Sequence, residues 1–153
     1  MKLSIQNVGE IKIKNIVLDY NGTIAKDGIV KESVKKYIKV LSESFDIYVI
    51  TSDTHGSAAK NLEGLNVKLK ILKSNNHTKE KEEFVKELQS VFAIGNGSND
   101  SLMLKASEIG VCVMENEGAS SKSIVNSDIV CKSMEDAFEL LLKPKRIIAT
   151  LRE

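Results

Sequence analysis

The sequence predicts an α/β fold in which a three-layer, doubly wound parallel sheet is covered by helices on both faces. Short apolar runs alternate with amphipathic stretches along almost all of the 153 residues, as in strands joined by crossover helices. The runs lack clean polar alternation, which is expected of strands covered on both faces. A composition of 42% hydrophobic and 28% charged residues is typical of one globular domain, so we expect a single domain over residues 1–153.

The strands are expected at the apolar runs. Residues 3–5 and 10–13 favour a hairpin ribbon that precedes the sheet. Apolar runs then predict six strands, at 15–19, 46–51, 67–72, 91–95, 109–113 and 128–130.

The helices are expected where apolar residues recur three and four positions apart. This spacing predicts helices over 31–42, 78–89 and 133–142. Shorter helices are expected near Gly56 and through Met103. The only proline, Pro144, is expected to end the last helix.

Charge and composition disfavour several classes of function. The chain has 22 basic and 21 acidic residues, so it projects no basic field that would hold a nucleic acid. Cys112 and Cys131 lie far apart and away from histidine, which argues against a zinc or redox site. The first residues form no apolar signal segment and no apolar run reaches about 18 residues, so we expect a cytoplasmic protein without membrane contact.

Polar residues follow three of the expected strands, and ligands bind beyond the carboxyl ends of parallel strands. These segments are Asp19-Tyr20-Asn21-Gly22-Thr23, Thr51-Ser52-Asp53 and Gly95-Asn96-Gly97-Ser98-Asn99-Asp100. Each segment alone has a structural alternative. Asn21-Gly22 also suits a hairpin turn, and the other two segments also suit helix caps. Their joint occurrence at strand ends favours a binding or catalytic site.

These segments resemble the motifs of the haloacid dehalogenase (HAD) superfamily of aspartyl-phosphate enzymes, over about residues 13–142. The first motif, Asp-x-x-Gly-Thr after an apolar strand, matches residues 19–23. The second and fourth match residues 51–53 and 95–100, and the third is a lysine matched by Lys81. Within the superfamily the chain looks most like the phosphorylation domain of P-type ATPases, as a free-standing soluble protein.

The assignment of Lys81 to the third motif is also supported by the spacing of apolar residues in its helix. Lys81 lies three and four residues before Phe84 and Val85, on the apolar stripe of its helix, whereas Lys79 points off that stripe. A helix that leads into a parallel strand starts at the edge of the sheet where the site is expected. The alternative is a lysine that snorkels from a half-buried stripe.

The resemblance implies a HAD-like Rossmannoid fold without a cap domain, and a Mg²⁺-dependent phosphohydrolase with a phosphoaspartate intermediate on Asp19. The substrate would be a phosphorylated small molecule or a phosphoprotein. The residues with catalytic roles would be Asp19, Asn21, Thr51 and Lys81. The residues that bind phosphate would be Thr51, Ser52, Lys81, Gly22 and Asn99. Those around Mg²⁺ would be Asp19, Asn21, Asn96 and Asp100.

Two departures from the family pattern bear on activity. Asn21 stands where phosphatases of this superfamily carry the acid/base Asp, so turnover is expected to be slow. Asn96 replaces a carboxylate in the fourth motif, so weaker Mg²⁺ binding is expected. A non-catalytic HAD-like binding or regulatory module is therefore the alternative. His55 and His77 are expected in loops, and neither is assigned a role.

The expected site is open, because neither position at which such enzymes insert a cap has room for one. An open site in this superfamily goes with large substrates or with a neighbouring subunit that acts as a lid, so a homo-oligomer is one expectation. The tail at 143–148 is a candidate for that contact, and docking of the tail on its own domain is the alternative.

Overall fold

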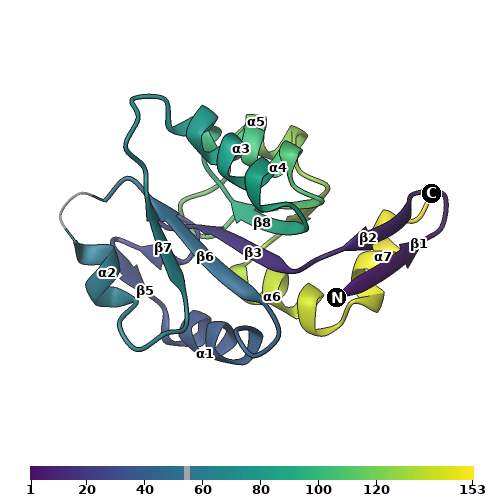
Figure 1. The fold of residues 1–153 in the computed structure, drawn as a ribbon, viewed down its shortest axis with the longest axis horizontal. Coiled ribbons are helices and arrows are strands. Elements are labelled where there is room, and N and C mark those ends of the chain that lie inside the picture. The colour runs from purple at the N-terminus through teal and green to yellow at the C-terminus, as the bar shows by residue number, and fades with distance from the viewer. Residues whose placement is uncertain (54–55) are drawn as a thin grey trace.

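The computed structural model describes residues 1–53 and 56–153, so His55 lies outside the described residues. Its centre is a six-stranded sheet with strand order β10-β9-β8-β3-β6-β7 (Figure 1). All neighbouring strands in this sheet are parallel. The strands are β3 (Asn15–Asp19), β6 (Asp46–Thr51), β7 (Lys68–Ile71), β8 (Val91–Gly95), β9 (Ile109–Val113) and β10 (Ile129–Cys131).

The order of the strands reverses beside β3. The chain runs from β3 to β6 and β7 on one side, then crosses to β8 and continues to β9 and β10 on the other side. A crevice opens at the carboxyl ends of strands where the order reverses in this way. The topology therefore places the ends of β3, β6 and β8 together, as the sequence predicts.

Helices form a layer on each face of the sheet (Figure 1). Ile16 and Leu18 of β3 belong to a core with α1 (Glu32–Leu41), α2 (Ser57–Asn61) and α6 (Met134–Leu142). Val17, between them, belongs to a second core with α3 (His77–Leu88) and α4 (Ser101–Ala106). Neighbouring residues of one strand thus face opposite layers, and the predicted three-layer α/β class is confirmed.

Most expected strands form at the expected positions. The four runs at 15–19, 46–51, 91–95 and 109–113 are strands with the predicted bounds. The expected strand 67–72 is one residue shorter at each end, and its residues are exposed or half-buried because β7 is an edge strand. The strand expected at 128–130 begins one residue later, because Asp128 instead exchanges two hydrogen bonds with Gly110.

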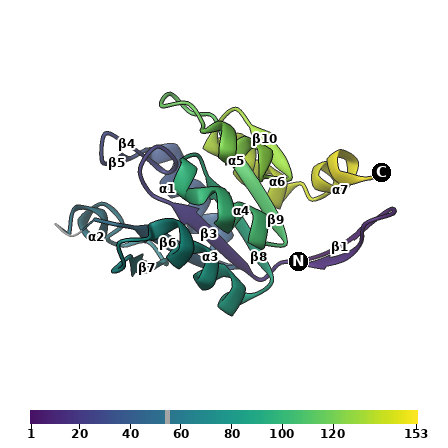
Figure 2. The ribbon, with the colours of Figure 1, turned by 90° about the horizontal axis from the view of Figure 1, so that it is seen from above.

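The N-terminal ribbon and the C-terminal tail pack together. Strands β1 (Lys2–Ile5) and β2 (Gly9–Lys12) form the predicted antiparallel hairpin. Helix α6 ends at Leu142, just before Pro144, as the sequence predicts, but it is not the last helix, because α7 (Lys145–Leu151) follows it. Pro144 has φ −61°, which suits a helix start, and the buried Ile147 joins the core. The tail therefore docks on its own domain, beside the hairpin (Figure 2).

A small hairpin, which no apolar run in the sequence predicts, lies between β3 and α1. It consists of β4 (Ala25–Lys26) and β5 (Ile29–Val30), and its turn residues Asp27 and Gly28 have φ of 51° and 79°. The carbonyl of Gly28 accepts hydrogen bonds from Tyr20 and Asn61, which fix the turn against the body of the domain. This hairpin and α1 account for the connection between β3 and β6, which holds no cap domain.

A further helix, α5 (Ser121–Val125), follows β9 on the same face as α4. None of the helices in residues 1–53 and 56–153 has the length and apolar character needed to span a membrane.

Candidate active site

A cavity of about 260 Å³ opens at the carboxyl ends of β3, β6 and β8, and we call it the main cavity. Its lining residues are Asp19, Asn21, Thr51, Ser52, Leu72, Lys81, Asn96, Gly97, Asn99 and Glu117. Seven of the nine site residues predicted from sequence are among them. Of the other two, Asp100 is fully buried and contacts Lys81, and Gly22 lines an adjoining cavity.

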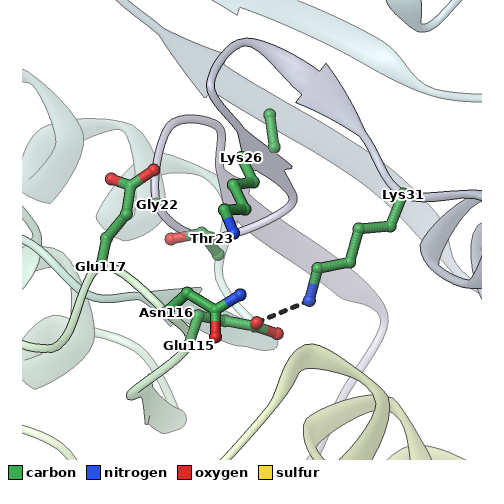
Figure 3. Close-up of a pocket in the computed structure, with 8 residues that line it drawn as sticks. Gly22, Thr23, Lys26, Lys31, Glu115, Asn116 and Glu117 are labelled. Carbon is green, nitrogen blue, oxygen red and sulfur yellow. Dashed lines mark hydrogen bonds and ion pairs between the residues drawn. The ribbon is translucent and has the colours of Figure 1, made fainter.

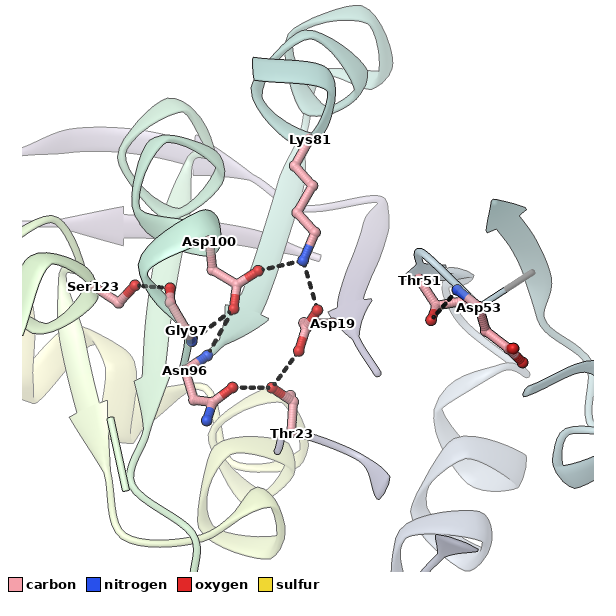
Figure 4. Close-up of polar contacts among 9 residues, drawn as sticks. All are labelled: Asp19, Thr23, Thr51, Asp53, Lys81, Asn96, Gly97, Asp100 and Ser123. Carbon is pink, nitrogen blue, oxygen red and sulfur yellow. Dashed lines mark hydrogen bonds and ion pairs between the residues drawn. The ribbon is translucent and has the colours of Figure 1, made fainter. Parts of the chain in front are cut away.

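The charged centre of the site is a lysine shared by two carboxylates. Lys81 Nζ lies 2.6 Å from Asp19 Oδ1 and 2.6 Å from Asp100 Oδ1 (Figure 4). Lys81 is only 1% exposed, although its helix is rich in Lys and Glu. A buried ammonium group is stable only with such partners. Lys81 thus lies beside Asp19 in the lining of the main cavity, on the side of its helix that the sequence predicts.

Asp100 is held in place by the backbone of its own loop. Its Oδ2 accepts the amide N–H of Asn96 at 3.0 Å and of Gly97 at 2.9 Å. A Cβ at Gly95 would lie 2.6 Å from the Asp100 side chain, so only glycine leaves room for it. Through the N–H of Gly97, Asp100 caps the short 3-10 helix η1 (Ser98–Asp100), but it makes no side-chain cap hydrogen bond to α4.

Burial and charge act in opposite directions on these groups. Burial, and then repulsion by Asp100, raise the pKa of Asp19 to about 6 against the opposing effect of Lys81. Burial works against the charged form of Lys81, but its attraction to Asp19 and Asp100 outweighs this and raises its pKa. One lysine therefore does not neutralise two carboxylates, and the site favours a further cation.

The Thr23 hydroxyl and the Asn96 amide join three loops around Asp19. Thr23 Oγ1 lies 3.1 Å from Asp19 Oδ2 and 3.2 Å from Asn96 Oδ1, and Asn96 Nδ2 donates to the carbonyl of Gly118 at 3.0 Å. Gly22 has φ +75°, and a Cβ there would lie 2.6 Å from Asn96 Nδ2. Asn21 forms only an isolated parallel bridge with Ala25, so the hairpin alternative for Asn21-Gly22 is wrong.

The residues directly after β6 have two different roles, because some line the main cavity and one binds the start of α2. Thr51 and Ser52 line the main cavity, and Thr51 Oγ1 accepts the N–H of Asp53 at 3.1 Å. Asp53 Oδ2 accepts the N–H of Ala58 at 2.6 Å and the hydroxyl of Ser57 at 2.7 Å. Asp53 therefore caps α2, as the structural alternative predicts, while Thr51 and Ser52 face the site.

The donor atoms suit Mg²⁺ better than a softer metal. The two carboxylates and the Asn21 and Asn96 oxygens are hard ligands, and the excess negative charge favours a cation. In the described part of the chain no group of three or more His, Cys, Asp or Glu side chains lies close enough to hold a metal. The small donor set of two carboxylates and two amide oxygens suits Mg²⁺, an ion that keeps several water ligands.

Glu117 lines the main cavity, and sequence reasoning missed it. It belongs to the loop after β9, which also contributes to a narrow side cavity lined by Gly22, Thr23, Ala25, Lys26, Lys31, Glu115, Asn116 and Glu117 (Figure 3). Glu115 is paired with Lys31 at 2.6 Å and accepts the N–H of Met134, so it supports the loop. The available signal was the acidic segment directly after the apolar run 109–113.

Comparison with known sequences identifies relatives. No family model matches the chain. The chain is 48% identical over 88 residues to the uncharacterized protein MJ0073 of Methanocaldococcus jannaschii, a match that covers 56% of this chain and 85% of MJ0073. It is 51% identical over 39 residues to the uncharacterized protein MJ0072 of the same organism, covering 26% and 89% of the two chains. The chain belongs to the same family as MJ0073.

Comparison with solved structures identifies the fold. A structure described as a HAD superfamily (subfamily III A) hydrolase from Legionella pneumophila has a TM-score of 0.72 at 14% identity, covering 91% of this chain and 87% of that chain. The 3-deoxy-D-manno-octulosonate 8-phosphate phosphatase of Moraxella catarrhalis, in complex with magnesium and phosphate ions and KDO, has a TM-score of 0.72 at 15% identity, covering 92% and 94%. The cobalt-bound Haemophilus influenzae phosphatase has a TM-score of 0.68 at 16% identity, covering 92% and 90%. The fold of this chain is the HAD-like Rossmannoid fold.

Proposed function

We propose that this member of the MJ0073 family is a Mg²⁺-dependent phosphohydrolase that works through a phosphoaspartate on Asp19. The observation that carries the proposal is the buried group of Asp19, Lys81 and Asp100 at the carboxyl end of the central strand. Nucleophilic transfer needs a carboxylate at an open cavity and cations that stabilise the phosphoryl oxygens. The cavity, the lysine and the excess negative charge of the site match these needs.

Each residue then has a role in phosphoryl transfer. Asp19 attacks the phosphorus, and Lys81 and Thr51 hold phosphoryl oxygens with their ammonium and hydroxyl groups. Ser52 and Asn99 would contact the phosphate from the cavity wall. Gly22 donates its N–H to the Ala25 carbonyl at 2.9 Å, so it shapes the first loop instead of binding phosphate. Mg²⁺, held by Asp19, Asp100 and the oxygens of Asn21 and Asn96, would neutralise charge on the phosphate.

Asn21 governs the rate in this proposal. It lines the main cavity where an acid/base carboxyl group would serve, and its amide neither donates a proton to a leaving group nor accepts one from water. We therefore expect slow turnover and a long-lived phosphoenzyme, which would be similar to the behaviour of the phosphorylation domain of P-type ATPases.

The substrate class follows from the open site. The connection from β3 to β6 carries no cap, so the phosphate site is reached directly from solvent. Either a phosphorylated small molecule or a phosphoprotein fits this access. The likeness to a phosphatase whose structure holds magnesium, phosphate and a sugar acid supports the small-molecule choice.

A phosphorylation experiment tests the proposal. The protein is incubated with acetyl phosphate and Mg²⁺, and intact mass measures a covalently added phosphate. We expect the phosphate on the parent and none on Asp19→Asn, with circular dichroism showing that the variant is folded. A variant that is phosphorylated like the parent would refute Asp19 as the nucleophile.

A non-catalytic module is the second candidate, because Asn21 and Asn96 replace two carboxylates. Such a module would bind Mg²⁺ and phosphate at the same cavity without turnover. It predicts binding of inorganic phosphate by calorimetry and no phosphoenzyme from any donor.

A further inference from the structure

A carboxylate from outside the predicted motifs lies over the first loop of the site. Glu117 lines the main cavity together with Asp19 and Lys81. A Cβ built on Gly22 would lie 2.9 Å from Glu117 Oε2, so this oxygen approaches the residue directly after Asn21. Glu117 thus presents a carboxylate beside the position where Asn21 lacks one.

The surroundings of Glu117 leave its carboxylate available. It is exposed to solvent, and throughout the described residues it forms no hydrogen bond or ion pair. Its charged neighbours are Asp19 and Lys81 in the main cavity and Lys26, Lys31 and Glu115 in the side cavity. Lys31 and Glu115 pair with each other, and Lys81 pairs with Asp19 and Asp100.

A role as metal ligand does not fit this geometry. Among residues 1–53 and 56–153 no three His, Cys, Asp or Glu side chains cluster closely enough to share an ion, so Glu117 does not complete a carboxylate set with Asp19 and Asp100. A carboxylate that is exposed to solvent and lines the same cavity as the nucleophile is instead suited to accept a proton from water.

We propose that Glu117 is the general base that hydrolyses the phosphoaspartate, an inference that rests on the proposed function. The Glu117 carboxylate accepts a proton from a water molecule whose oxygen attacks the phosphorus. The bond between phosphorus and the Asp19 oxygen breaks, and its electron pair returns to the Asp19 carboxylate. Inorganic phosphate leaves, and Glu117 releases its proton to solvent. In the first step, which forms the phosphoaspartate, Asn21 donates no proton to the leaving group.

The test separates formation of the phosphoenzyme from its decay. Parent and Glu117→Gln are loaded with acetyl phosphate and Mg²⁺, the donor is removed by rapid desalting, and intact mass follows the loss of phosphate with time. We expect formation within about twofold of the parent, because acetyl phosphate releases its leaving group unassisted. We expect decay to slow by about a hundredfold, the lower end for a positioned base.

Three further measurements exclude a merely structural effect. Glu117→Asp keeps a carboxylate with a shorter reach and should restore part of the decay rate. Glu10→Gln removes an exposed carboxylate on the distant N-terminal hairpin and should decay like the parent. Hydroxylamine needs no general base, so it should release phosphate from Glu117→Gln as fast as from the parent.

Each outcome decides a separate point. Decay of Glu117→Gln within twofold of the parent would overturn the role of Glu117 and leave the phosphoaspartate standing. Equal slowing of formation and decay would also overturn it, because a distorted site impairs both steps. A parent that forms no phosphoenzyme would overturn the proposed function itself and this inference with it.

Discussion

Lys81 is the residue on which the electrostatics of the site depend. Its single positive charge faces the buried carboxylates of Asp19 and Asp100 at 2.6 Å each. Removing the lysine would leave two buried like charges, whereas removing one carboxylate would leave a matched pair. Asp19 therefore lowers the stability of the metal-free protein, as is expected of a residue that serves function and not folding.

The charge balance predicts that Asp19→Asn stabilises the metal-free protein at neutral pH. The raised pKa of Asp19, about 6 against an ordinary 3.8, means that the folded state binds a proton more tightly than the unfolded state. The contribution of Asp19 to stability is therefore greatest below pH 4 and is lost as the pH rises to about 6. Chemical denaturation in EDTA measures the unfolding free energy of both proteins. The difference between variant and parent should shift in favour of the variant by about 2–3 kcal/mol as the pH rises from about 4 to about 6. A difference that does not vary with pH would contradict this.

Asn21→Asp is predicted to raise turnover. The residue lines the cavity with Asp19, so a carboxyl group there would lie in the cavity that holds the leaving group in the proposed reaction. Positioned acid/base groups contribute about a hundredfold or more. The gain should be largest for alkyl phosphates, whose leaving groups most need a proton. Phosphate release should be measured on alkyl and p-nitrophenyl phosphates at saturating Mg²⁺, because the added charge also affects metal and phosphate. Flat or reduced turnover on the alkyl phosphate would show that Asn21 does not limit hydrolysis.

Residue identity at strand ends was enough to predict most of the cavity lining. Asp19, Thr51 and Asn96 each follow an apolar run, so the parallel topology brings them together. Glu117 was missed because its loop carries no motif and its side chain reaches the cavity only through the path of the chain after β9. The contacts of Asn96 with Thr23 and Gly118 were also not predictable, since they depend on loop geometry.

At the scale of elements, long buried runs were the most predictable. β3, β8 and β9 are fully buried, and their continuous apolar sequences determine where they begin and end. β4 and β5 have two residues each, too few for a periodic signal, although their Asp27-Gly28 turn is a strong hairpin indicator. α7 was missed because a proline that cannot continue one helix readily begins another.

Because α7 docks on the domain away from the site, truncating its buried side chain should lower the unfolding free energy without reducing phosphoenzyme formation. Ile147 is fully buried where α7 meets β1 and α6, so Ile147→Ala should cost about 2–4 kcal/mol of unfolding free energy. The half-buried Ile148 is the matched control, and its truncation should cost less. The hairpin joins the amino end of β3, opposite the site, so phosphoenzyme formation per folded molecule should be unchanged. Denaturant titration and intact mass measure the two quantities, and a cost below 1 kcal/mol would mean that the tail is only loosely attached.

At the scale of the whole molecule, the site joins loops from strands that are far apart in the sequence. Asn96 after β8 contacts Thr23 after β3 and Gly118 after β9. Lys81 contacts Asp19 from α3, in the helix layer that α3 forms with α4 (Figure 4). A cation would bind to this site only in the folded protein, because the unfolded chain does not bring these residues together. Its binding free energy would therefore add to the stability of the entire domain.

This linkage predicts how Mg²⁺ and Asn96→Asp act together. In EDTA the variant should be less stable by about 1–3 kcal/mol, because Asn96 Nδ2 no longer donates to the Gly118 carbonyl and a third carboxylate enters the site. Mg²⁺ binds a site with three carboxylates more tightly, so at a given concentration the gain in unfolding temperature should be larger in the variant than in the parent. Asp100→Asn, which removes a carboxylate, should show the smallest gain. Thermal unfolding across a Mg²⁺ titration measures all three, and equal gains in parent and Asn96→Asp would place residue 96 outside the metal site.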